Sequence, residues 1–153
     1  MGYTAMIIHD LSSEKCRELL ARTNIGRLAC VNDLQPYVVP VSFVYSASKI
    51  YIFTTIGQKV DWMRANPLVC LQVDEIITHQ DWQSVLVFGE YQELADHQSR
   101  ARAHDLLARP ANWWEPGYAS TLVQGKTRPL EPIYFSISIS KLTGRQGLPD
   151  KSK

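Results

Sequence analysis

Apolar and polar residues along the chain follow first the period of a helix and then that of a strand. Between residues 12 and 23, Cys16, Leu19 and Leu20 recur at helical spacing behind a pair of serines that can cap the helix. Further on, apolar residues alternate or cluster in short segments between turn residues, which predicts strands. The predicted strands cover residues 27–31, 37–45, 50–55, 68–75, 83–94 and 133–140.

Two more helices and two irregular strand positions complete the pattern. Helices are predicted at residues 58–66, ended by an Asn-Pro pair, and at residues 96–109, with Asp96 as the cap. Pro40 cannot donate to a strand ladder, so it predicts an edge, a bulge or a backbone open to a ligand. Gly89 predicts a bulge or a close approach of two backbones.

Six predicted strands, short turns and only two long helices favour a mainly β fold, a small antiparallel barrel with flanking helices. The length of 153 residues suits one domain, placed at residues 1–145, and residues 146–153 are expected to form a mobile tail. Residues 110–132 read as a long irregular segment. Because side chains fill a barrel this small, a large ligand must lie outside it or at a subunit interface.

The composition narrows the classes of protein. The formal net charge is +1, so no overall basic field exists to attract nucleic acid or a membrane surface. Cys16, Cys30 and Cys70 lack metal-ligand spacing and are expected to be free, mostly buried thiols in a reducing compartment. No segment is apolar for long enough to span a bilayer, and the N-terminus lacks signal-peptide features. We therefore expect a cytoplasmic protein with no metal site that binds neither nucleic acid nor membrane.

The segment TTIGQK, from Thr54 to Lys59, joins a strand to a helix and collects groups that bind phosphate. A helix N-terminus offers backbone N–H groups and a favourable dipole, the two threonines offer hydroxyls, and Lys59 offers a charge. Gly57 permits close approach of the backbone. The spacing is not that of a P-loop, and a threonine-capped turn with a solvated lysine explains the same residues. Both interpretations stay open on these residues alone.

Other candidate groups are less specific. The four histidines are scattered without zinc-type spacing, and no nucleophile–histidine–carboxylate signature is present. Trp113 and Trp114 can stack on a planar ligand, or form a hydrophobic cover or a dimer contact. No side chain is identified as a catalytic acid or base, so the catalytic residues are unknown at this stage.

Five segments follow one another in a particular order: GRLACV, PYVVPVSFVY, KIYIFTTIGQKVDWMRANPLVCLQVDE, WQSVLVFGEYQEL and a last strand with LTGR. This order resembles the pyridoxamine 5'-phosphate oxidase-like family of FMN-binding split β-barrels, in the branch that includes nitroimidazole-resistance proteins. The resemblance covers residues 25–93 and, more loosely, residues 133–145. It implies an antiparallel split barrel of Greek-key type and a homodimer with two FMN molecules at its interface.

The resemblance also implies which residues hold the cofactor. One strand would lie along the flavin ring and bond its polar edge through the backbone of Val39, Pro40, Val41, Ser42 and Phe43. The phosphate would be held at Phe53, Thr54, Thr55 and Lys59. The partner subunit would contribute Gln83 and Ser84. Lys59 stands alone where the oxidases proper carry a basic pair, so a related activity is implied rather than pyridoxamine-phosphate oxidation itself.

The leading hypothesis is an FMN-dependent oxidoreductase acting on a small molecule at the dimer interface, with Trp113 or Trp114 as a lid. The alternatives are a flavin-binding protein without turnover, for storage or sensing, and a haem-binding relative on the same barrel. A deazaflavin is an alternative cofactor. Haem would need an axial histidine, and His79 is the candidate nearest the predicted barrel core.

Overall fold

The structure, a computed structural model, describes residues 5–108, 120–123, 126–129 and 132–151. The helices are α1 (Ser13–Arg22), α2 (Gln58–Ala65) and α3 (His97–Leu107). The strands are β1 (Met6–Asp10), β2 (Ile25–Asn32), β3 (Gln35–Ser46), β4 (Lys49–Thr55), β5 (Leu68–Thr78), β6 (Asp81–Glu93), β7 (Ser120–Val123), β8 (Lys126–Pro129) and β9 (Pro132–Pro149). Every predicted helix and strand is confirmed, with ends shifted by a few residues, except that the last strand continues nine residues beyond its predicted end at residue 140.

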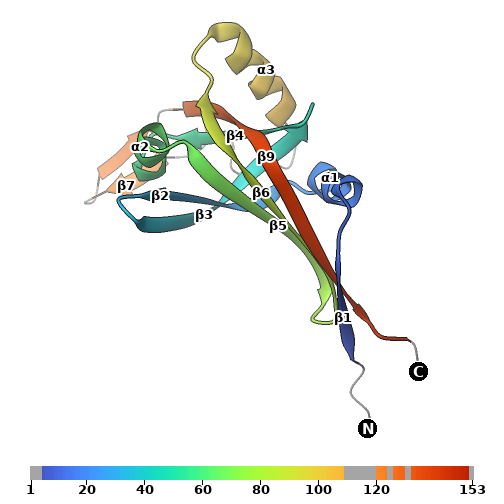
Figure 1. Cartoon of the computed structure of the whole chain (residues 1–153). Helices are drawn as coiled ribbons and strands as arrows, with labels where there is room; N and C mark the ends of the chain where they lie inside the picture. Colours follow the sequence, from blue (N-terminus) through green and yellow to red (C-terminus); the bar gives the residue numbers. More distant parts are fainter. Residues whose placement is uncertain (1–4, 109–119, 124–125, 130–131, 152–153) are drawn as a thin grey trace.

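Six antiparallel strands close into a barrel. They lie in the order β9, β4, β3, β2, β5 and β6, and β6 pairs back onto β9 (Figure 1). The interior is filled by apolar side chains, among them Phe43, Ile52, Leu71, Val87 and Phe135, all fully buried. This confirms the predicted mainly β fold, a split barrel with flanking helices. Because the inside is solid, a ligand of flavin size must bind on the outside.

Strand β9 is the longest element and continues beyond the barrel. Its first half pairs with β4, and its last residues pair with β1, from Met6 opposite Pro149 to Asp10 opposite Arg145. In Figure 1 this end of β9, β1 and the β5–β6 hairpin project from the barrel as an arm that carries both chain ends. The expected mobile tail is therefore wrong for residues 146–149, which are paired strand.

Two further strands and one bulge refine the predicted pattern. β7 and β8 form a hairpin inside residues 110–132, which were expected to be irregular. The register between β6 and β9 shifts after Phe88, and a Cβ on Gly89 would overlap the carbonyl oxygen of Ser138. Gly89 therefore marks both a bulge and a close backbone approach, as predicted.

Each helix covers a different part of the barrel. α1 buries Cys16, Leu19 and Leu20 in the main core near the start of β6. α2 buries Val60 and Met63 and lies against β2, near the end of β6. α3 packs its buried Ala103 and Leu107 on the outward side chains of β3, β4 and β9. The helices thus close two ends of the barrel and one outer surface.

One outer surface of the barrel has no cover from any described helix. We call it the outer sheet face. Cross-strand register places Val38, Ala29, Cys70 and Phe88 on it in one row, and Val38 and Phe88 are 65% and 38% exposed. The same face carries toward the arm Leu86, Ser84, Trp82, Ile76 and Arg145. An apolar sheet face of this extent marks an interaction surface.

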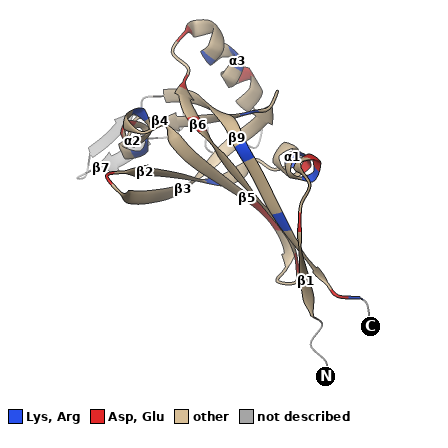
Figure 2. Cartoon of the chain, viewed as in Figure 1, with Lys and Arg blue, Asp and Glu red and all other residues tan. Residues whose placement is uncertain are grey.

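The distribution of charged residues and the state of the cysteines are as expected from the sequence. Acidic and basic positions are interspersed over the described elements, with no large area of one sign (Figure 2). All three cysteines are free thiols, with Cys16 and Cys30 buried and Cys70 partly buried. Among the described residues, no helix is both long and apolar enough to cross a membrane, and no group of three or more metal-binding side chains occurs.

Candidate functional site

The corner between β4 and α2 presents an uncapped helix N-terminus. Gly57 is the N-cap residue, and no side chain bonds the first N–H groups of α2. A Cβ on Gly57 would meet only the carbonyl oxygen of Thr55, at 4.0 Å, and its φ of 177° is extended backbone open to any residue. The threonine cap of the simpler interpretation is therefore absent, and Gly57 leaves open space in front of the helix.

Lys59 lies in the first turn of α2 and is half-buried. It faces the buried thiol of Cys30 on β2, and burial lowers the pKa of Lys59 while the thiol opposes that shift. Within the described residues, no carboxylate pairs with this ammonium group. Lys59 is thus a partly desolvated cation without a counter-charge, and it lies beside free helix N–H groups. Such a site is suited to bind an anion.

The two threonines at the end of β4 point in opposite directions. Thr54 is 7% exposed and shares its strand face with Ile50 and Ile52, which fill the barrel. Thr55 shares the other face with Phe53, whose ring packs at 4.7 Å on Tyr134 beneath α3. The structure therefore brings only Thr54 to the inner side on which Lys59 meets Cys30.

Strand β3 has a free edge beside this corner. Pairing with β4 begins at Phe43, so among the described strands residues 35–42 pair with β2 alone. The Phe43 N–H donates to the Asn24 carbonyl at 2.9 Å on the β2 side. Alternation then turns the peptide groups of Val38, Pro40 and Ser42 toward the free edge. Pro40 is tolerated because its missing N–H lies on that unpaired edge.

The side chains of the predicted ring-binding strand do not all face this edge. Val41 and Phe43 are buried in the core, and Val39 packs against it, whereas Pro40 and Ser42 face outward. A ligand at the free edge can therefore meet the backbone of this strand but not the side chains of Val41 and Phe43. The predicted role, which relied on the backbone of this strand, stays a prediction.

The second predicted pair, Gln83 and Ser84, is divided between two faces of β6. The Gln83 side-chain oxygen accepts a hydrogen bond from Arg22 of α1 at 2.9 Å, so it is held within its own chain. Ser84 instead lines a pocket of about 520 Å³ on the outer sheet face. The walls of that pocket are formed by Asp10, Trp82, Ser84, Leu86, Thr143, Gly144 and Arg145.

This outer pocket is rich in hydrogen-bond donors. The Ser84 hydroxyl accepts from Gln72 at 3.2 Å and keeps its proton for another acceptor. Arg145 lies opposite Ser84 in the register, is exposed, and forms no ion pair with the residues that the structure describes. The indole of Trp82 lies over Gly147, where a Cβ would approach it to 2.7 Å. A flat ring and an unpaired guanidinium thus share one pocket.

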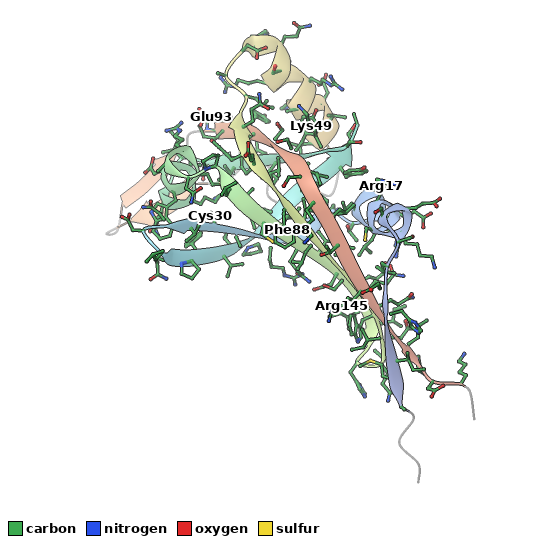
Figure 3. All side chains as sticks on the ribbon, viewed as in Figure 1. Arg17, Cys30, Lys49, Phe88, Glu93 and Arg145 are labelled. Carbon is green, nitrogen blue, oxygen red and sulfur yellow. The ribbon has the colours of Figure 1, made fainter. Side chains whose placement is uncertain are left out.

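The corner and the outer pocket lie far apart within one chain. α2 touches β6 at its last residue, Glu93, whereas Ser84 lies near the start of that strand. The corner is at the other end of α2, where Lys59 faces Cys30 in the core. Ala29, next to Cys30, is level with Phe88, which is four residues or roughly 13 Å along β6 from Ser84 and two strands away from Ala29. Ser84 lies on the outer sheet face, on the opposite side of the sheet from the core. Figure 3 shows Cys30 and Glu93 toward the α2 end and Arg145 on the arm side. A single small ligand therefore cannot touch both sites of one chain.

Comparison with known protein families shows to which family the chain belongs. The sequence model described as pyridoxamine 5'-phosphate oxidase matches residues 12–146. The chain belongs to the pyridoxamine 5'-phosphate oxidase family. The match begins after β1 and covers α1, α2 and nearly all of the barrel strands, so the family assignment does not rest on the corner alone.

Similar proteins align with this chain over most of its length. The uncharacterized protein RA0666 of Rhizobium meliloti is 40% identical over 144 residues, which cover 92% of this chain and 95% of the relative. The crystal structure of a FAD-binding protein (mll6688) from Mesorhizobium loti is 37% identical with a TM-score of 0.76, covering 94% of this chain and 98% of the other. A candidate 5-nitroimidazole antibiotic resistance protein from Bacteroides thetaiotaomicron shares the fold, with 17% identity, a TM-score of 0.70 and coverage of 94% and 90%.

Some candidate residues of this family member fall outside these two sites. Trp113 and Trp114 lie outside the described residues. His79 is exposed between β5 and β6 and lines neither described pocket. Sequence reasoning missed Trp82 and Arg145 as site residues. Their segments carry the family resemblance, and only the register of β6 with β9 brings them together.

Proposed function

We propose that this family member is an FMN-dependent oxidoreductase that works as a homodimer on a small molecule. The observation that carries the proposal is Lys59, a half-buried cation at an uncapped helix N-terminus without a carboxylate partner among the described residues. A phosphate would supply the missing charge and accept the free N–H groups. Membership of the family and similarity to a FAD-binding protein support a flavin as the molecule that carries this phosphate.

The residues of the chain fit such a cofactor. Lys59, Thr54 and the first N–H groups of α2 would hold the phosphate, and the free edge of β3 would bond the polar edge of the ring. When bound, FMN supplies hydride or electron transfer. The chain would bind the ring and orient it along the edge of β3. Ser84 and Arg145 would approach from the partner subunit, because within one chain they lie too far from the corner.

A homodimer accounts for the outer sheet face. The described helices leave this face uncovered, and it carries apolar side chains from Val38 on β3 to Ile76 on the arm. The outer pocket opens in the middle of it. We expect an interface above about 2,000 Å² in total, as in obligate dimers. A second copy would then cover the apolar side chains and deliver Ser84 and Arg145 to the corner of its partner.

Ligand analysis tests this function directly. We expect the purified protein to show blue and near-ultraviolet flavin bands, and denaturation to release FMN. The apo-protein should bind FMN at least about tenfold more tightly than riboflavin, which lacks the phosphate, and turnover should follow reduction of the bound flavin.

Other results would redirect the proposal. Equal affinities for FMN and riboflavin would refute the phosphate site. Tighter binding of FAD than of FMN would identify FAD as the cofactor. Binding without turnover of any acceptor would indicate a storage or sensing protein. A Soret band would indicate haem, and a stable monomer with FMN bound would exclude the shared site.

A further inference from the structure

The far end of α2 carries a second cation with the opposite environment from Lys59. Arg64 donates from Nε to Glu93 Oε1 at 2.8 Å and from Nη2 to Oε2 at 3.2 Å. The hydroxyl of Tyr91 donates to the same Oε1 at 2.6 Å. One carboxylate at the end of β6 is thus held by a bidentate guanidinium and a short charge-assisted bond. We call these three residues the Glu93 clamp.

Protonation states within the Glu93 clamp are fixed over a wide pH range. The bonds from Arg64 and then Tyr91 lower the pKa of Glu93, and the bond to Glu93 raises the pKa of Arg64. Burial and the bond to Glu93 raise the pKa of Tyr91. Near neutral pH the carboxylate and guanidinium therefore stay charged, and the phenol keeps the proton that it donates.

The clamp joins the last turn of α2 to the end of β6. Val60 and Met63 are buried beneath the helix, and the Trp62 ring lies 5.7 Å from the Tyr37 ring. Arg64, one turn after Val60, borders a pocket of about 420 Å³ together with Glu93 and Ile56 among others. Ile56 directly precedes Gly57, so the loop of the corner and the clamp border the same open space. The clamp therefore fixes the last turn of α2 to β6 by polar bonds, beside the open space that the corner loop also borders.

We propose that Glu93 and Tyr91 are positioning residues that, by fixing Arg64, hold α2 in the orientation in which Lys59 and the helix N–H groups meet a phosphate. The clamp touches no ligand itself. α2 has eight residues, so a tilt at its last turn moves its first turn. This inference rests on the proposed phosphate site and names the groups that orient it.

The ratio of riboflavin to FMN dissociation constants isolates the effect. It reports recognition of the phosphate and is insensitive to a general loss of folded protein. We expect Glu93→Gln to lower this ratio about three- to tenfold, and Arg64→Ala to do the same. Arg64→Lys should recover part of the ratio, because lysine keeps the charge without the bidentate geometry. Glu90→Gln, an exposed carboxylate on the same strand, is the matched control and should leave the ratio unchanged.

A double variant completes the test. In Lys59→Ala the charge to be positioned is gone, so adding Glu93→Gln should lower the ratio by less than it does in the wild-type chain. If Glu93→Gln lowers thermal stability but leaves the ratio at the wild-type value, the clamp is only structural and the inference is wrong. If the wild-type ratio is itself near one, the phosphate site fails first, so the two failures are distinguishable.

Discussion

The two ends of α2 carry the same kind of charge in different surroundings. At the first turn, Lys59 is half-buried and lacks a carboxylate among the described residues, beside a helix start without a side-chain cap. At the last turn, Arg64 is 44% exposed and held by both oxygens of Glu93. A cation that serves the fold is paired within the chain, and one kept for a ligand is left unpaired at some cost in stability.

Two glycines show a similar difference between a residue that the fold requires and one that it does not. Gly89 is required by the fold, because a side chain there would overlap the backbone of β9. Gly57 has open space around it and ordinary extended backbone, so nothing within the described chain requires a glycine at that position. The proposed ligand would account for the groups around the corner, whereas the contacts of the clamp and the bulge are made within the protein itself.

Removing the unpaired cation should have the largest effect on binding. A charge-assisted hydrogen bond contributes about 1.5–3 kcal/mol, so Lys59→Ala should weaken FMN binding roughly ten- to a hundredfold. Riboflavin affinity should stay unchanged, and Lys49→Ala at the other end of β4 is the control. Titration of the apo-proteins by flavin fluorescence measures both. Equal losses for the two ligands would show that Lys59 supports the fold and not a phosphate.

Mixed dimers test whether the corner and the outer pocket meet across subunits. Lys59→Ala removes the corner charge, and Ser84→Tyr fills the outer pocket. Each homodimer should bind FMN weakly, but a heterodimer should hold one intact site. Its FMN stoichiometry should return to about half that of the wild type, measured on tagged heterodimers after co-expression. No recovery would mean that corner and pocket do not belong to one shared site.

The two ends of α2 should also change the stability of the protein in two different pH ranges, one alkaline and one acidic. Burial places the pKa of Lys59 in the apo-protein below its ordinary 10.5, so protons favour the unfolded chain. Apo-protein stability should rise, and preference for FMN over riboflavin should fall, as pH increases from that lowered value toward 10.5. Melting curves and paired titrations across this range measure both. A stability that falls over the same interval would contradict the assigned burial of Lys59.

At the other end, Glu93 has a pKa below its ordinary 4.5. Its contribution to stability is present above that value and is lost as pH falls through the lowered pKa. Glu93→Gln should therefore flatten the acid side of the stability curve while leaving the alkaline side as in the wild type. The same melting curves provide the measurement, with Glu90→Gln as the reference. An unchanged acid limb would mean that Glu93 gains little from Arg64 in solution.

The smallest effect is expected at Thr55. If it capped α2, its replacement by alanine would cost about 1 kcal/mol. The structure shows no such bond, so Thr55→Ala should change the free energy of unfolding by less than about 0.5 kcal/mol. Ser12→Ala is the positive control, because the Ser12 hydroxyl accepts from the Lys15 N–H at 3.2 Å and caps α1. Denaturant unfolding of both variants compares a real cap with an absent one.

The sequence by itself determined the features that depend on residues close together in the chain. The helical period around Leu19 and Leu20, the pre-proline end of α2 and the strand alternation each depend on residues close together in the chain. They correctly predicted the barrel strands and all three helices, and the segment TTIGQK correctly marked a strand-to-helix corner. The bulge at Gly89 was also readable, because a glycine inside a strand commonly marks a bulge or a close backbone contact.

Only the tertiary structure decided the features that depend on pairing between distant segments. β1 was missed because its residues, Met-Ile-Ile-His-Asp, neither alternate between apolar and polar nor show a buried face, and it is a strand only by pairing with the far end of β9. Thr54 and Thr55 looked equivalent until the pleat of β4 turned them to opposite sides. Likewise, Arg64 and Glu93, or Ser84 and Arg145, are unrelated in sequence. They become neighbours because hydrogen-bonded register and packing, which are non-local, place them there.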